Sequence, residues 1–318
     1  MKAAVYSKNG GPEVFSYTEV ADPKPGSNQV LIKVEVISIE GGDLSNRLLS
    51  APPTSNYIVG YAAAGEIIEI GADVTGFQVG QKVITFSWAG SHAELRAVDA
   101  ASAYAIPEGM DPKLAIAAFI GVGTAALAIH LSAIQPGQRV LVSGATGGVG
   151  NAVVQLLVND GIEVIATGRS ANTLRSLDEF GVWKTVVSGE TPIHEQVKKI
   201  DEHGVDVFID TVGMEVLVDG IKAVKNGGKV VLIAGRVGEG NFIDPLYILS
   251  HRLTVIGCLL GAVMQEQFVV DLLHKSLRWV AEGKVEVPIH KVFKLADAES
   301  AHREAEKSGK FGRILMVP

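Results

Sequence analysis

A glycine-rich turn is the part of this chain whose residue types and spacing are best suited to chemistry. Ala145, Gly147 and Gly150 follow the apolar run 140–142 and precede an amphipathic segment. Glycine lacks Cβ, so backbone N–H groups there can approach a phosphate at the N-terminus of a helix. The pattern is A-x-G-x-x-G rather than G-x-G-x-x-G, but the strand before it and the helix after it support the same interpretation. We therefore predict a dinucleotide-binding βαβ unit over 139–170.

The end of the second strand of this unit indicates which dinucleotide binds. Sites that prefer NAD usually carry an Asp or Glu about twenty residues after the turn. Here the strand ends at Gly168 and is followed by Arg169 and Ser170, with Arg175 one turn further on. A guanidinium and a hydroxyl suit a 2′-phosphate, so we expect NADPH rather than NADH. The alternative is that Arg169 is only a solvated loop charge.

Length and composition restrict the class of protein that must position this turn. A chain of 318 residues exceeds one typical core and suggests two domains. Hydrophobic residues make up 47% and charged residues 20%, as in an α/β enzyme. Only 6% are aromatic and the net charge is -7, so we expect no nucleic-acid partner.

Targeting and redox signals are weak in this sequence. We find no run of about eighteen apolar residues and no signal peptide, so we expect a cytoplasmic protein without membrane contact. Cys258 is the sole cysteine, which excludes an intrachain disulfide and a cysteine-rich zinc site. Its apolar surroundings favour a small buried hydrophobe over a reactive thiol.

The pattern of predicted secondary structure changes near residue 113. Residues 1–105 alternate short β-like runs with turns, which is typical of a β-barrel-like domain. After 113, helical segments alternate with buried strands, which predicts a doubly wound parallel sheet of the Rossmann type. Two of those strands end at Asp210 and at Ala234-Gly235, and such ends should line the cofactor crevice. The last strand-like segments should rejoin the first domain.

Across essentially its whole length the chain resembles the zinc-independent medium-chain dehydrogenases/reductases, in particular quinone oxidoreductases and enone reductases related to zeta-crystallin. The segments that carry the resemblance are "MKAAVYSKNGGPEVF", "PKPGSNQVLIKVEVISI", "GADVTGFQVGQKV", "GSHAELRAV", "GATGGVG", "FIDTVG" and "GRILMVP". The resemblance implies an α/β protein with a GroES-like β-rich catalytic domain and a Rossmann domain. It implies domain boundaries at 1–115, 116–262 and 263–318, and a homodimer joined through the strand 253–258.

The resemblance also bears on metal binding. The zinc-dependent branch supplies a Cys, a His-Glu pair and a second Cys to a catalytic zinc. In this chain Glu40 stands at the first Cys position and Tyr61-Ala62 replaces the His-Glu pair. We therefore expect no metal.

Site residues follow from the resemblance and from the strand ends. The expected catalytic residues are Tyr61, Asp43 and Glu40, with His92 as a further candidate near the substrate. Glu40 could instead pair with Arg47 or His92. The expected cofactor-binding residues are Thr124, Gly144, Ala145, Thr146, Gly147, Gly148, Val149, Gly168, Arg169, Ser170, Arg175, Asp210, Thr211, Val212, Ala234, Gly235, Arg236, Leu259 and Leu260.

These features indicate an NADPH-dependent oxidoreductase. Its expected reaction is hydride transfer to a small-molecule electrophile, either a quinone or the C=C bond of an α,β-unsaturated carbonyl. Two alternatives stay open. One is a zinc-independent NADPH-dependent aldehyde or alcohol dehydrogenase, and the other is an NADPH-binding protein with little turnover.

Overall fold

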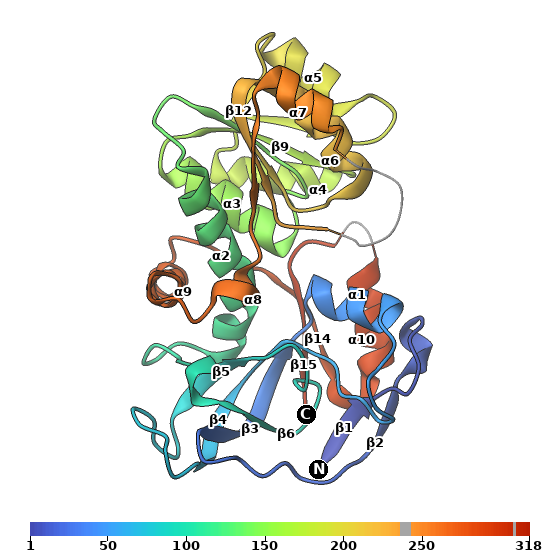
Figure 1. Cartoon of the computed structure of the whole chain (residues 1–318), viewed down its shortest axis with the longest axis vertical. Helices are drawn as coiled ribbons and strands as arrows, with labels where there is room; N and C mark the ends of the chain where they lie inside the picture. The colour runs from blue at the N-terminus through green and yellow to red at the C-terminus, as the bar shows by residue number, and fades with distance from the viewer. Residues whose placement is uncertain (236–242, 308–309) are drawn as a thin grey trace.

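The chain folds into two domains, each built on its own sheet (Figure 1). The computed structural model describes residues 1–235, 243–307 and 310–318. Both chain termini lie in the same domain, at the bottom of Figure 1. The central part of the chain forms the other domain, in agreement with the expected return of the C-terminal segment.

The dinucleotide-binding domain contains a six-stranded sheet in which every neighbouring pair is parallel. In spatial order its strands are β10 (Lys184–Val187), β9 (Glu163–Gly168), β8 (Arg139–Val142), β11 (Val205–Asp210), β12 (Val224–Leu232) and β13 (Thr254–Gly257). Numbered along the chain, this is the order 3-2-1-4-5-6 of a doubly wound sheet. The prediction of a Rossmann domain is therefore confirmed.

Both faces of this sheet are covered because its strands are apolar without alternation. In β8, Val140 and Val142 face one buried cluster while Leu141 faces another. The helices of this domain are α3 (Gly148–Asn159), α4 (Ala171–Leu174), α5 (Ile193–Ile200), α6 (Met214–Gly220) and α7 (Pro245–His251). The glycine turn therefore lies at the carboxyl end of a central strand, between β8 and α3.

The catalytic domain contains a mostly antiparallel seven-stranded sheet. Its path is β14 (Ile289–Lys294), β15 (Arg313–Val317), β3 (Gln29–Ser38), β4 (Ala62–Ile70), β5 (Lys82–Phe86) and β7 (Ala103–Ala105), with β6 (Leu95–Asp99) paired to β3. Strands β1 (Lys2–Val5) and β2 (Ser16–Glu19) form a separate antiparallel pair. Helices α1 (Gly41–Leu49) and α10 (Ala298–Glu306) complete the domain. Because β15 pairs with β3, both chain ends contribute to one sheet.

A long helix, α2 (Pro112–Ser132), connects the two domains (Figure 1). It packs against α3 and α9 (Gln267–Ala281), and also against β3, β4 and β5 of the catalytic sheet. Small residues permit these approaches, since a Cβ on Gly121 would lie 3.0 Å from the carbonyl oxygen of Gly148. The C-terminal part returns to the catalytic sheet at Ile289, after α8 (Leu260–Val263) and α9, later than the boundary that we expected at 263.

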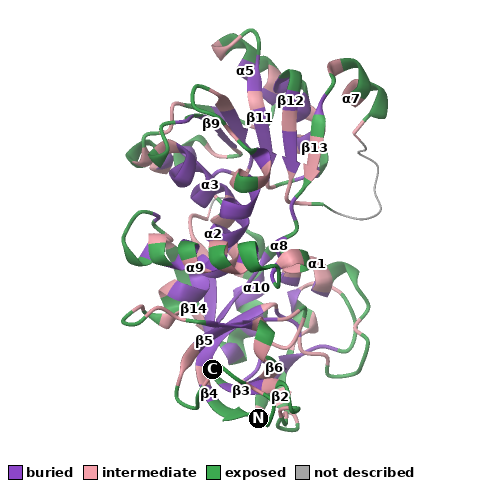
Figure 2. Cartoon of the chain, turned by 60° about the vertical axis from the view of Figure 1, so that its left-hand side comes forward, coloured by how far each residue is buried: buried purple, intermediate pink, exposed green. Residues whose placement is uncertain are grey.

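The expectation that no stretch is long and apolar enough to cross a membrane was wrong for α2. By length and composition this helix could do so, with a mean hydropathy of 2.1 over eighteen residues. However, 72% of that stretch is buried within the protein. Figure 2 shows the helix enclosed between the domains, where it serves as a core helix.

Candidate active site

A cleft of about 740 Å³ lies between the two domains. Its lining includes residues of both domains that the sequence indicated as candidates. From the catalytic domain come Glu40 and Tyr61, together with Asn46 and Trp88. The expected cofactor residues that line it are Thr124, Val149, Thr211, Val212, Ala234, Gly235, Leu259 and Leu260. Candidate catalytic groups and candidate cofactor groups therefore share one cavity.

The glycine turn has the geometry of an anion site. Gly144 has φ +57°, and a Cβ there would lie 2.5 Å from Thr211 Oγ1. A Cβ on Gly150 would lie 2.3 Å from the carbonyl oxygen of Gly144, so the turn has no room for side chains. Gly147 is the N-cap of α3 and has no side chain to cap it. The first N–H groups of the helix are therefore free of a capping side chain and suited to a phosphate.

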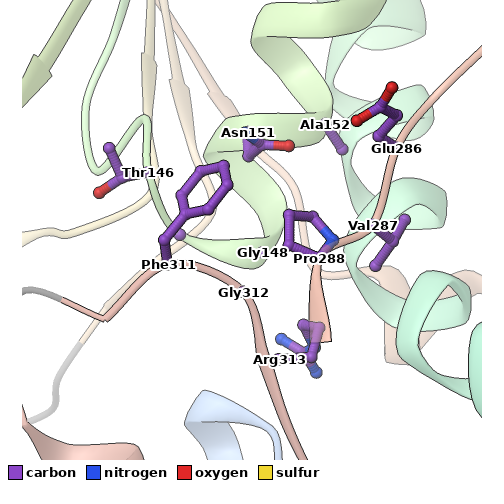
Figure 3. A pocket seen from close by; sticks show the side chains of 11 residues that line it. Thr146, Gly148, Asn151, Ala152, Glu286, Val287, Pro288, Phe311, Gly312 and Arg313 are labelled. Atoms are coloured by element: carbon purple, nitrogen blue, oxygen red, sulfur yellow. The ribbon is translucent and has the colours of Figure 1, made fainter. Parts of the chain in front are cut away.

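The C-terminal segment of the chain reaches this turn. Figure 3 shows Phe311 and Arg313 beside Thr146 and Gly148, around a small pocket. A Cβ on Gly148 would lie 2.7 Å from Arg313 Nη1. Ala145 is fully buried, so only its backbone could contribute to binding. The catalytic domain thus contacts the glycine turn directly.

The loop after β11 corrects one expected cofactor residue. Asp210 is fully buried and does not line the cleft. Its carboxylate accepts hydrogen bonds from Ser143 Oγ at 2.6 Å and from the Gly213 N–H at 2.8 Å. Burial raises its pKa, and these donors partly offset that effect. Asp210 therefore holds the loop that presents Thr211 and Val212.

The end of β9 carries the residues expected to read a 2′-phosphate. A Cβ on Gly168 would lie 3.9 Å from Thr146 Oγ1, so this strand end lies next to the glycine turn. Arg169 and Arg175 are exposed. Ser170 caps α4, accepting a hydrogen bond from the Thr173 N–H at 3.4 Å. The expected residue Arg236 lies outside the described residues.

Lys310 is a cation near this strand end that the sequence analysis missed. Burial lowers its pKa, and the nearby charges of Arg169 and Arg313 lower it further. Its ammonium donates to the carbonyl oxygens of Ala305 and Lys307, at 2.5 Å and 3.0 Å. Lys310 belongs to the C-terminal segment, so no local pattern around 168–175 could have indicated it.

Tyr61 presents its hydroxyl to the cleft. Asn46 Nδ2 donates a hydrogen bond to Tyr61 Oη at 3.1 Å, which leaves the phenolic proton for another partner. Burial and the nearby Asp43 raise the pKa of Tyr61, so the group stays protonated at neutral pH. A Cβ on Gly42 would lie 2.2 Å from the Tyr61 ring, so the start of α1 packs closely against it. Tyr61 is thus a positioned hydrogen-bond donor.

Asp43 has a different role from the one expected. It is fully buried and absent from the lining of the cleft. Its carboxylate accepts from the N–H groups of Glu40 at 2.8 Å and Tyr61 at 3.1 Å. Burial raises its pKa to about 8. Asp43 therefore holds the backbone on both sides of the site, at Glu40 and at Tyr61.

Glu40 pairs with neither of the expected partners. Its carboxylate binds the guanidinium of Arg313, which also donates to Ser38 Oγ at 2.9 Å. Arg47 is buried and pairs with Glu306, the last residue of α10. His92 is fully buried, and its Nε2 lies 2.9 Å from His302 Nε2. All three partners come from the C-terminal part of the chain.

The structure gives no cluster of metal ligands in the part of the chain it describes. Among residues 1–235, 243–307 and 310–318, no three His, Cys, Asp or Glu side chains are grouped to hold an ion. Cys258 lies at the cleft, where burial raises its pKa to about 12. The prediction that this thiol is buried rather than reactive agrees with that position.

Comparisons with known proteins agree with this architecture. The profile of the alcohol dehydrogenase GroES-like domain matches residues 26–133, and that of the zinc-binding dehydrogenases matches 148–275. Quinone oxidoreductase of Rattus norvegicus is 29% identical over 327 residues, covering 100% of this chain and 98% of its own. Acryloyl-coenzyme A reductase of Sulfurisphaera tokodaii is 28% identical, covering 100% of both chains.

A solved structure shows the same fold. The NADPH complex of Escherichia coli quinone oxidoreductase superimposes with a TM-score of 0.93 at 24% identity, covering 100% of both chains. A GroES-like domain joined to a dinucleotide-binding Rossmann domain across a shared cleft defines a two-domain oxidoreductase. The two profiles together span most of the chain and place it in the medium-chain dehydrogenase/reductase family, and quinone oxidoreductases are among its full-length relatives.

Proposed function

We propose that this protein is an NADPH-dependent reductase that transfers hydride, without zinc, to a quinone or to the C=C bond of an α,β-unsaturated carbonyl. The observation that carries the proposal is the position of Tyr61 in the same cleft as Thr124 and Leu259. A protonated hydroxyl thus belongs to the same cavity as the groups that would hold the nicotinamide. The names of the relatives, quinone oxidoreductase and acryloyl-coenzyme A reductase, support the same class of reaction.

The contacts of Glu40 and Tyr61 support a reaction without zinc. Glu40 occupies the position of a zinc ligand in the zinc-dependent branch, but here it binds the guanidinium of Arg313. A metal at this position would compete with a cation already in place. Tyr61, at the second ligand position, accepts a hydrogen bond from Asn46. A neutral phenol is a poor zinc ligand, whereas it is a good hydrogen-bond donor.

The roles of the residues follow from their contacts. The reduced nicotinamide, when bound, supplies the hydride. The Tyr61 hydroxyl donates a hydrogen bond to the substrate carbonyl oxygen as negative charge develops there. Asn46 fixes the direction of that hydroxyl, and Asp43 fixes the backbone of Tyr61. Leu48 and Leu49 add apolar surface to the cleft, and solvent supplies the proton that completes the reduction.

Arg169 is the residue that we propose to select NADPH over NADH. Its guanidinium is exposed at the carboxyl end of β9, next to the turn. We expect Arg169→Ala to raise KM for NADPH by about tenfold while KM for NADH changes little, since one charge-assisted hydrogen bond is lost. Steady-state kinetics with both cofactors measures this. Lys199→Ala, an exposed cation on α5 that has no assigned role in the site, is the matched control. Equal Michaelis constants for the two cofactors in the unaltered protein would contradict the assignment.

The decisive experiment for the reaction uses chelator-treated protein with NADPH. The acceptors are an acyclic enone, a 1,2-quinone, a 1,4-quinone and a saturated aldehyde, with loss of nicotinamide absorbance and product identity as readouts. Reduction of the alkene or the quinone after chelation supports the proposal. Reduction of the aldehyde alone indicates a carbonyl dehydrogenase, and NADPH binding without turnover indicates a binding protein.

A further inference from the structure

Trp88 is a large aromatic side chain in the cleft that the mechanism above does not use. It follows β5, lines the cleft and is 48% exposed. Its ring centroid lies 5.3 Å from that of Tyr61 at an interplanar angle of 87°, and 5.3 Å from that of Phe86 at 74°. Two neighbouring rings therefore hold the indole by edge-to-face contacts, the arrangement that aromatic pairs favour.

Gly261 of α8 supports the indole from the other domain. A Cβ at this position would lie 2.6 Å from Trp88 Cη2 and 2.8 Å from Phe86 Cζ. The φ of Gly261 is not in the left-handed region, so the backbone itself does not require glycine. The missing side chain makes room for the indole, which is thus fixed between the domains before any ligand binds.

The indole also forms a wall between two hollows. A second cavity of about 440 Å³ shares Phe86, Trp88 and Gly261 with the cleft. Space on the cleft side lies next to Tyr61, the proposed donor to the substrate carbonyl. A flat acceptor whose oxygen reaches Tyr61 would therefore come to lie against the indole.

The charges around the two hollows favour an uncharged ligand. Of the residues that line them in the described parts of the chain, none is lysine, arginine or histidine. The carboxylates of Glu40 and Glu306 line the cleft, and their arginine partners lie behind them. An acyl-coenzyme A carries several negative charges, which would meet these carboxylates and no cation among the described lining residues.

We propose that Trp88 is the specificity-determining residue of the substrate site, with its indole receiving the ring of an uncharged planar acceptor in preference to an acyl-coenzyme A thioester. This inference rests on the proposed reductase function and names its substrate class. Stacking on a preordered indole costs little side-chain entropy, so ring-containing acceptors gain affinity that acyclic ones do not.

The first test compares three acceptors with NADPH: 1,2-naphthoquinone, 3-buten-2-one and crotonyl-coenzyme A. We expect Trp88→Ala to lower kcat/KM for the naphthoquinone about tenfold, mainly through KM, and to change that for butenone by less than about twofold. Trp88→Phe should recover part of the loss. Trp279→Phe, on α9 and outside both hollows, is the matched control. Equal losses on both acceptors, or crotonyl-coenzyme A reduced as well as the naphthoquinone, would overturn the proposal.

A second test does not depend on turnover. The chain has three tryptophans, so Trp183→Phe/Trp279→Phe leaves Trp88 as the only one. With NADP⁺ present, 1,2-naphthoquinone should quench its fluorescence saturably, and crotonyl-coenzyme A should not compete. Saturable quenching without reduction of any acceptor would contradict the reductase function but keep the binding site. Reduction of the quinone without quenching would contradict the role of Trp88 alone.

Discussion

At the scale of single residues, the hydroxyl of Tyr61 is the group whose removal tests the mechanism most directly. Tyr61→Phe keeps the ring that packs on Phe86 and Trp88 and removes the donor. We expect kcat for an enone to fall about 10- to 100-fold, somewhat less than the loss for a full oxyanion-hole donor, with NADPH affinity unchanged. Stopped-flow hydride transfer and NADPH fluorescence titration measure the two quantities.

Asn46→Ala tests the orientation of the Tyr61 hydroxyl separately from its presence. It keeps the Tyr61 hydroxyl but removes the hydrogen bond at 3.1 Å that orients it. The expected fall in kcat is smaller than for Tyr61→Phe, and the double variant should be no slower than Tyr61→Phe alone because the two groups act as a unit. Additive losses would place Asn46 in a separate role.

The pair of Glu40 and Arg313 makes a prediction about stability. Both side chains are largely buried, so Arg313→Met leaves a buried carboxylate without its cation. We expect the free energy of unfolding to fall by about 3 kcal/mol, as for other broken buried pairs. Glu40→Gln/Arg313→Met should recover most of this loss, since neither charge then remains. Urea unfolding of the single and double variants measures it, and equal losses in both would refute the pairing as the cause.

The residues of the site differ in how much of the sequence must be considered to predict their roles and their partners. The glycine turn and Arg169 could be identified because their meaning depends on neighbours within about thirty positions. Glu40 and Tyr61 could be identified from the resemblance, but their surroundings could not. The partner of Glu40 lies 273 positions away, and that of Arg47 lies 259 positions away. No spacing pattern encodes contacts that arise only when the C-terminal strand joins the sheet.

At the scale of elements, the fold could be predicted where it depends on short-range patterns in the sequence, and could not where it depends on long-range packing. Uninterrupted apolar runs such as 140–142 predicted parallel strands, and all of that sheet is parallel. Helix α2 was harder to interpret because it is apolar on every side, a feature that membrane helices share with core helices. Only its packing between two domains separates these alternatives.

The contact between His92 and α10 makes the catalytic domain sensitive to acid. His92 Nε2 faces His302 Nε2, and His92 Nδ1 lies 3.1 Å from Ser91 Oγ. One Nε2 donates and the other accepts, and burial keeps both rings neutral. Within the described parts of the chain His302 Nδ1 is buried without a hydrogen-bond partner, which fits an acceptor nitrogen, so His302 donates from Nε2. Burial lowers the pKa of His92 to about 3 and that of His302 well below 6.5.

These shifts give the direction of the pH dependence. In the unfolded chain both histidines take up protons below about pH 6.5, whereas the folded protein resists protonation. The stability is therefore fully present above pH 6.5 and falls as pH decreases towards 3. For His92 alone the loss is about 2 kcal/mol at pH 5. His302→Gln, which can still bond to His92, should make the decline shallower. An unchanged slope of unfolding free energy between pH 7 and 5 would contradict this.

At the scale of the whole molecule, β13 is an edge strand of the Rossmann sheet, with no strand beyond it among the described residues. The adjacent helix α7 is largely exposed (Figure 2). It carries two exposed leucines, Leu246 at 68% and Leu249 at 73%. An unpaired edge beside exposed apolar side chains favours pairing with a second copy. We therefore keep the prediction of a homodimer joined edge to edge through β13, with a mass of about 67 kDa, twice 33.5 kDa.

Light scattering coupled to size exclusion tests this assembly. Leu246→Glu/Leu249→Glu places two carboxylates where the second copy would bury apolar surface, so we expect the mass to fall to that of the monomer. Val79→Glu changes another exposed apolar residue, 58% exposed and in the other domain, and should leave the dimer intact. The cleft residues named above all belong to one chain, so we expect NADPH affinity to survive dissociation. A dimer that persists in the double variant would place the interface elsewhere on the molecule.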